Sequence, residues 1–140
     1  MKKGENKLEV FTIGQELPVY EVKVDSQMYR KYNRLIKEIN PIHFNKKYAL
    51  KLGYDDIVIA GNFLFTYIPK WVIDWVENVE AIKKIDVKFE NPVYPEDTII
   101  HKGKITDIRE ENEKTLIECD YEVEKPSGER TSYGKVTLSL

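Results

Sequence analysis

One short segment of the chain holds residue types that can exchange protons with a substrate. Glu38 and His43 lie five positions apart, with Asn40-Pro41 between them. The residue before a proline avoids the helical region, so the chain must turn at Asn40, and functional residues concentrate at turns. Such a turn can fold the Glu38 carboxylate back toward the imidazole, which makes the two a candidate acid/base pair. The alternative is that Glu38 is a solvated helix residue and His43 an ordinary residue of the turn.

The elements that flank this turn follow from the spacing of apolar residues. Residues 8–24 are expected to be extended, because Tyr20, Val22 and Val24 alternate with charged residues. Ser26 can cap a helix that must end near Asn40. The apolar face expected for that helix comprises Met28, Tyr32, Leu35, Ile36 and Ile39. After the turn, residues 46–52 predict a short helix that ends at Gly53.

The most apolar part of the chain, residues 63–79, predicts a long buried helix. Its broad apolar stripe comprises Leu64, Ile68, Trp71, Val72, Trp75, Val76 and Val79, and other apolar residues lie off the stripe. A helix that is apolar on most sides is a buried one. Pro69 must either kink this helix or mark a later start.

From Ile85 onward the apolar period changes from helical to alternating, which predicts strands. Three more are expected at residues 98–108, 116–124 and 131–140, joined by hairpin loops at 109–114 and 125–130. Cys119 is expected on an inward face. His101 is expected to be a surface or pairing residue of its strand. An antiparallel sheet must bury its apolar face, and the long helix is the obvious partner. We therefore predict an α+β hot-dog fold, with about five strands curled around a central helix.

Length and composition limit the remaining possibilities. The 140 residues fit a single domain, residues 1–140, in which residues 1–7 form a frayed tail. A net charge of −2 gives no general attraction to nucleic acid or to an anionic membrane. One cysteine forms no internal disulfide and no zinc site. Without a signal peptide, a membrane span or a cofactor motif, the expected location is the cytoplasm, and neither metal nor cofactor is expected.

Three segments, in order along the chain, resemble one known family. Residues 38–43, E-I-N-P-I-H, resemble the D-x-N-P-x-H motif of MaoC-like dehydratases and R-specific enoyl-CoA hydratases, and the likeness continues to Gly53. Residues 87–103, VKFENPVYPEDTIIHKG, resemble the Phe-x-x-Pro-Val-x-Pro-Gly-Asp-x-Leu segment of that family. Residues 133–136, Y-G-K-V, are similar to its closing strand.

The resemblance implies reversible addition of water to a trans-2-enoyl thioester of coenzyme A or acyl-carrier protein, as in fatty acid metabolism. If the roles of the motif carry over, His43 and Glu38 hold the water, and Asn40 shapes the turn or hydrogen-bonds within it. Backbone N–H groups at Gly61-Asn62, at the start of the buried helix, bind the thioester carbonyl. The open edges of such a sheet favour a homodimer or a larger assembly.

The sequence departs from the family pattern at two places. Glu38 stands where the family has Asp, and Gly61-Asn62-Phe63 stands where it has His-Gly-Met. An added methylene displaces a catalytic carboxylate, and a displacement of about 1 Å can cost roughly 100-fold in rate. Two further hypotheses therefore stay open. In the first hypothesis, the chain is a non-catalytic hot-dog subunit that binds acyl chains beside a catalytic partner. In the second, it is a hot-dog thioesterase with Glu38 as base or nucleophile.

Overall fold

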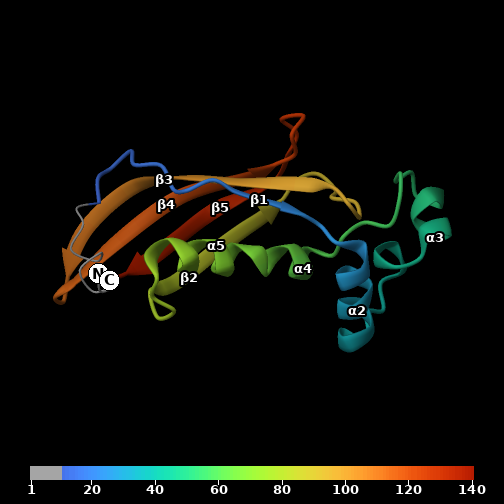
Figure 1. Ribbon diagram of the computed structural model, residues 1–140, viewed down its shortest axis with the longest axis horizontal. Coiled ribbons are helices and arrows are strands. Elements are labelled where there is room, and N and C mark those ends of the chain that lie inside the picture. The colour runs from blue at the N-terminus through green and yellow to red at the C-terminus, as the bar shows by residue number, and fades with distance from the viewer. Residues whose placement is uncertain (1–10) are drawn as a thin grey trace.

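The computed structural model describes residues 11–140, which form one antiparallel sheet with helices along one face and at one end (Figure 1). The strands are β1 (Tyr20–Lys23), β2 (Ile82–Phe89), β3 (Thr98–Glu111), β4 (Lys114–Glu124) and β5 (Arg130–Ser139), in the order β1-β3-β4-β5-β2. Every neighbouring pair is antiparallel. The predicted α+β hot-dog fold with five strands is confirmed.

The strands at the first predicted hairpin loop are longer than expected. β3 continues to Glu111 and β4 begins at Lys114, so that only Asn112 and Glu113 form the turn. Their φ angles are 51° and 64°. Positive φ at both central residues matches the twist of the flanking strands in a two-residue hairpin. Charged residues that predicted a loop are thus paired strand residues.

The buried helix consists of two helices, α4 (Gly61–Phe65) and α5 (Tyr67–Val76), that meet at Thr66. Pro69 is the third residue of α5, and it has no N–H to donate to the Phe65 carbonyl at the end of α4. The proline therefore marks a later start, one of the two outcomes expected. The boundaries differ from residues 63–79: the first helix begins at Gly61, and α5 ends at Val76 because Glu77 is left-handed, with φ 57°. Val79 lies outside α5 and is exposed.

The core lies between α5 and the inward face of the sheet. Trp71 is buried against it and donates its indole N–H to the Pro18 carbonyl at 2.6 Å. Cys119 is fully buried on β4, as predicted, and burial raises the pKa of its thiol to about 12. The other fully buried apolar side chains of the sheet include Ile105, Ile117, Val136 and Leu138.

Helix α2 (Ser26–Ile36) differs from its prediction in cap, end and buried face. The cap is Asp25, whose carboxylate accepts from Gln27 N and Met28 N, and Ser26 is the first helical residue. The helix ends at Ile36 because Lys37 is left-handed. Three members of the predicted apolar face, Met28, Leu35 and Ile36, are exposed, and Ile39 lies beyond the helix, 88% exposed. The residues that α2 buries are Tyr29 and Asn33.

His101 was expected to be a surface or pairing residue of its strand; it pairs with Tyr20 of β1 and Val123 of β4, but it is buried and not at the surface. Its side chain is 1% exposed, packed among the rings of Tyr20, Tyr67 and Trp71. Nδ1 donates to the Tyr20 carbonyl across the β1–β3 pair, at 3.0 Å. Burial disfavours the charged imidazolium and lowers the pKa of His101 to about 4.

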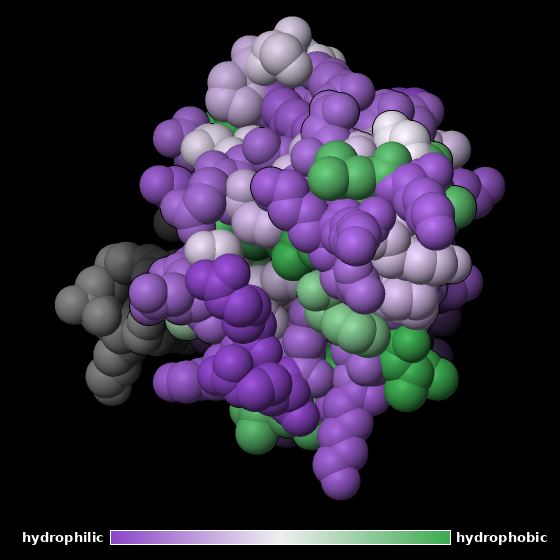
Figure 2. Space-filling view, turned by 90° about the vertical axis from the view of Figure 1, so that its right-hand side faces the viewer, coloured by the Kyte–Doolittle hydropathy of each residue, from purple (hydrophilic) through white to green (hydrophobic). Residues whose placement is uncertain are grey.

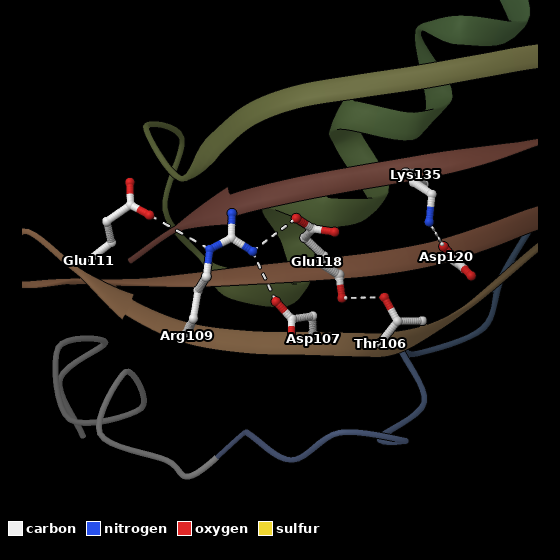
Figure 3. Close-up of polar contacts among 7 residues, drawn as sticks. All are labelled: Thr106, Asp107, Arg109, Glu111, Glu118, Asp120 and Lys135. Atoms are coloured by element: carbon white, nitrogen blue, oxygen red, sulfur yellow. Dashed lines mark hydrogen bonds and ion pairs between the residues drawn. The ribbon is translucent and has the colours of Figure 1, made fainter.

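The outward face of the sheet carries charged side chains that pair with one another. Arg109 contacts Asp107, Glu111 and Glu118, and a lysine and an aspartate on neighbouring strands form a further pair (Figure 3). Such solvent-exposed pairs are screened by water and salt and add little to stability. The face is therefore a solvated one. Among residues 11–140 no helix is long and apolar enough to cross a membrane, and no group of side chains forms a metal site.

The buried neutral histidine predicts a pH-dependent stability. Between its folded pKa of about 4 and an unfolded pKa of about 6.5, the unfolded chain binds the proton and the folded chain does not, so stability falls as pH falls through this window. Between pH 7 and pH 5 we expect a loss of about 2 kcal/mol in the free energy of unfolding, measured by urea denaturation. His101→Asn keeps a donor for the Tyr20 carbonyl and is expected to abolish this pH dependence. An equal loss in the variant would contradict the assignment.

Candidate functional site

The turn between α2 and the following helices is built on Asn40 and Pro41. Residues Pro41–His43 form one 3₁₀ turn, and Asn40 caps it: its Oδ1 accepts from Ile42 N at 3.2 Å, and its carbonyl accepts from His43 N at 3.1 Å. Proline suits the first position because a helix leaves that N–H without an internal acceptor. Asn40 therefore hydrogen-bonds within the turn, which is one of the two roles expected for it. Its side-chain oxygen is used to hold the backbone of the turn.

His43 has a fixed orientation. Its Nδ1 lies 2.7 Å from the Val58 carbonyl. A carbonyl oxygen can only accept, so Nδ1 carries the proton of the neutral ring, and Nε2 keeps its lone pair. The side chain is half-buried. This arrangement leaves Nε2 able to take a proton from a bound molecule.

Tyr29 and Asn33, both on α2, hold the backbone of this turn. The Tyr29 hydroxyl lies 3.0 Å from the His43 carbonyl and 3.3 Å from the Val58 carbonyl, and it accepts from Ala60 N at 2.9 Å. Asn33 Nδ2 donates to the same His43 carbonyl at 3.1 Å. Burial raises the pKa of Tyr29, so the hydroxyl stays protonated. Sequence reasoning missed both residues, although their spacing of four places them on one face of the helix.

Gly61 and Asn62 begin α4, immediately after Ala60. Their N–H groups belong to the first turn, which has no acceptor within the helix, and neither donates to any residue between 11 and 140. The Asn62 side chain is exposed and does not cap the helix. The Phe89 ring of β2 lies against Gly61, where an added Cβ would come within 2.7 Å of it. A side chain at position 61 would therefore require the exposed Phe89 ring to move.

Glu38 makes its contacts within its own loop. Its Oε2 accepts from Ile39 N and Asn40 N, each at 3.1 Å. In the described part of the chain no hydrogen bond or ion pair joins Glu38 to His43. Glu38 lines a cleft of about 760 Å³ on the α2 side, together with Asn33, whose buried Oδ1 has no partner among the described residues. The two predicted residues therefore flank one turn but are held by separate interactions.

The model of the MaoC like domain matches residues 10–126. The chain belongs to this family. In sequence it is 24% identical over 109 residues to the tomato (Solanum lycopersicum) mitochondrial protein named 3-hydroxyacyl-[acyl-carrier-protein] dehydratase FERN. That alignment covers 78% of this chain, which spans only 66% of the tomato protein's length.

Solved structures share the fold of this MaoC-like domain. The ChsH1-ChsH2 complex of Mycobacterium tuberculosis contains a chain that matches with a TM-score of 0.80 and 21% identity, over 94% of this chain and 99% of that one. The (R)-hydratase of A. caviae, described as involved in PHA biosynthesis, matches with a TM-score of 0.79 and 14% identity, over 93% and 97%.

Removing the Tyr29 hydroxyl tests its role in the MaoC-like domain. Tyr29→Phe leaves the Ala60 N–H without its acceptor in a buried position, so we expect a loss of about 1–3 kcal/mol in the free energy of unfolding, measured by denaturant titration. Tyr32→Phe is the matched control on the same helix, because the Tyr32 ring contacts Phe63 and its hydroxyl bonds to no described residue. Equal effects of the two changes would contradict the network.

Proposed function

We propose that the protein is a hydratase/dehydratase that interconverts trans-2-enoyl and 3-hydroxyacyl thioesters. The observation that carries this proposal is the bond from His43 Nδ1 to the Val58 carbonyl, which leaves Nε2 as a base on the turn that also holds Glu38. Membership of the MaoC-like family supports it, as do the names of the tomato dehydratase and the A. caviae hydratase.

In the hydration direction, a water molecule adds across the double bond next to the thioester carbonyl. His43 Nε2 takes a proton from the water while the oxygen bonds to C3 of the acyl chain. The protonated His43 then gives this proton to C2 of the resulting enolate, and the Glu38 carboxylate orients the water. Dehydration runs through the same steps in reverse. No redox change is involved, because the water supplies the hydroxyl group at C3 and, through His43, the proton at C2.

The developing enolate oxygen needs hydrogen-bond donors. The N–H groups of Gly61 and Asn62 are the candidates, since they have no acceptor among the described residues. They directly follow Ala60, whose N–H donates to the Tyr29 hydroxyl. Donors of this kind stabilise an oxyanion by about 3 kcal/mol each. In this proposal the Tyr29 hydroxyl fixes the distance between the base and these donors.

Two substitutions test the roles of the acid/base pair. His43→Ala is expected to lower the hydration rate of crotonyl-CoA by about 100-fold or more, with little change in melting temperature, because the Val58 carbonyl keeps the Tyr29 hydroxyl nearby. Glu38→Gln keeps a side-chain carbonyl for the Ile39 and Asn40 amides but loses the negative charge, and a large loss of rate is expected. Glu38→Asp retains part of the activity.

The matched control for both variants is His101→Asn, which changes a histidine outside the turn and is expected to retain full activity. If His43→Ala unfolds and its residual activity follows the folded fraction, the histidine is structural. If Glu38→Gln has no effect, the carboxylate only closes its own loop.

A second candidate function is that of a non-catalytic subunit beside a catalytic hot-dog partner. Two observations favour it: the Glu38 carboxylate bonds to its own loop, and the Phe89 ring lies against Gly61. The ChsH1-ChsH2 and HadBC structures of M. tuberculosis are complexes by name. If the protein alone hydrates no crotonyl-CoA and gains activity with a second hot-dog chain, this function replaces the first.

Either function predicts an assembly. Among residues 11–140, strand β2 pairs with β5 and with no other strand, so its other edge, eight residues long, presents backbone groups without a described partner. Natural proteins rarely leave such an edge open, and we expect a dimer or larger species in light scattering coupled to size exclusion at micromolar concentration. A wild-type monomer under these conditions would contradict the expectation.

A further inference from the structure

We propose that the end of the molecule formed by α2 and α3 (Lys46–Lys51) docks an acidic protein that carries the acyl group as a thioester. The acyl group in this proposal rests on the proposed function, whereas the docking surface rests on observations of its own. We call this surface the basic end, and it comprises residues 26–53. In Figure 1 it lies beyond the sheet, at the end of the molecule away from the C-terminus.

The charge of the chain is distributed very unevenly. Residues 26–53 hold seven lysines and arginines and one acidic residue, Glu38, whereas the other 112 residues hold 15 basic and 23 acidic side chains. A net charge of −2 for the whole chain conceals this separation. A surface with one sign of charge attracts a partner of the opposite sign and speeds its association.

The cations of the basic end are not used within the fold. In residues 11–140, none of the seven forms an ion pair or side-chain hydrogen bond. They are Arg30, Lys31, Arg34, Lys37, Lys46, Lys47 and Lys51. On the outward face of the sheet, in contrast, Arg109 and Lys135 are paired with carboxylates (Figure 3). As far as the described residues go, these cations are therefore available to contact charges on another molecule.

Apolar side chains are exposed among these cations. Among residues 11–140, twelve large hydrophobic side chains are exposed, and eight of them lie in the basic end. They are Met28, Leu35, Ile36, Ile39, Phe44, Tyr48, Leu50 and Leu52. Figure 2 views the molecule from this end and shows hydrophobic patches set among hydrophilic side chains. A mixture of exposed apolar groups with arginine and methionine is typical of protein interfaces.

The position of the basic end relative to the candidate site suits a carrier of the substrate. The Asn40–His43 turn lies between α2 and α3 in the chain. Glu38 lines the same cleft as four cations, Arg30, Arg34, Lys37 and Lys46, and two further carboxylates, Asp56 and Glu96, line it as well. A partner seated here would place an attached acyl arm beside the turn.

The spread of the cations favours a protein over a small anion. Lys31, Lys47 and Lys51 are exposed and lie outside the cleft that holds Glu38. A small polyphosphate needs cations that converge on one point, whereas a protein surface can meet charges distributed over two helices. A second copy of the chain cannot use the same face, because like charges would oppose each other.

The test compares two carriers of one acyl group. The variant Lys31→Glu/Lys47→Glu reverses one charge on each helix and leaves the residues that line the cleft unchanged. The control variant, Lys104→Glu/Lys114→Glu, makes the same change in charge at two exposed lysines of the sheet that bond to no described side chain. Hydration kinetics are measured with crotonyl-CoA and with an acidic acyl-carrier protein bearing a crotonyl group. Calorimetric titration with the same carrier protein, without the acyl group, measures docking independently of turnover.

We expect Lys31→Glu/Lys47→Glu to raise KM for the crotonyl carrier protein, and Kd in the titration, by about tenfold or more, with KM for crotonyl-CoA and both melting temperatures unchanged. The sheet variant should change none of these. Loss of carrier binding without turnover of either thioester would support docking and overturn the proposed function. Equal KM changes for both thioesters would overturn docking and assign the surface to coenzyme A. Unchanged binding of the carrier protein by Lys31→Glu/Lys47→Glu would also overturn docking. So would binding to vesicles containing phosphatidylserine that weakens in this variant, if the carrier protein itself does not bind.

Discussion

The Tyr29 hydroxyl joins three segments that are distant in the sequence. It lies against the carbonyls of His43 and Val58 and accepts the N–H of Ala60, and it is buried away from water. A buried polar group is stable only when its hydrogen bonds are satisfied, so this hydroxyl constrains where α2, the Asn40–His43 turn and the start of α4 can lie. The Val58 carbonyl contacts both this hydroxyl and His43 Nδ1, so it also orients the imidazole.

This constraint explains why α2 exposes apolar residues. The helix uses its inward face for Tyr29 and Asn33, which bond to the turn, and its apolar side chains therefore point elsewhere. A helix with polar groups inside and apolar groups outside gains little from isolated folding. The exposed apolar residues then remain available for contacts with other molecules, in the same region where basic residues lack partners.

Periodicity in the sequence was sufficient for the sheet and for the burial of the central helix. Alternation from Ile85 onward predicted four of the strands, and the apolar stripe predicted the helix that they cover. Pro69 predicted a kink or a later helix start, but not the position of the break at Thr66. The burial of His101 and the buried face of α2 could not be predicted, because both depend on hydrogen bonds to residues far away in the sequence. The apolar spacing assigned Met28, Leu35 and Ile36 to the core, and it gave no sign that Tyr29 and Asn33 bond to a turn farther along the chain. The motif placed His43 and Glu38 on one turn, but the separate hydrogen bonds of the two side chains are set by backbone groups that no motif records.

The central claim is that the Val58 carbonyl holds His43 in one neutral tautomer, with the proton on Nδ1 and the lone pair on Nε2. The ¹⁵N chemical shifts of the His43 ring at pH 8, recorded by long-range proton–nitrogen correlation and assigned by comparison with His43→Ala, report this directly. The structure predicts a protonated-type shift for Nδ1 and an unprotonated-type shift for Nε2. A proton on Nε2, or averaged shifts from rapid exchange between both tautomers, would contradict the account.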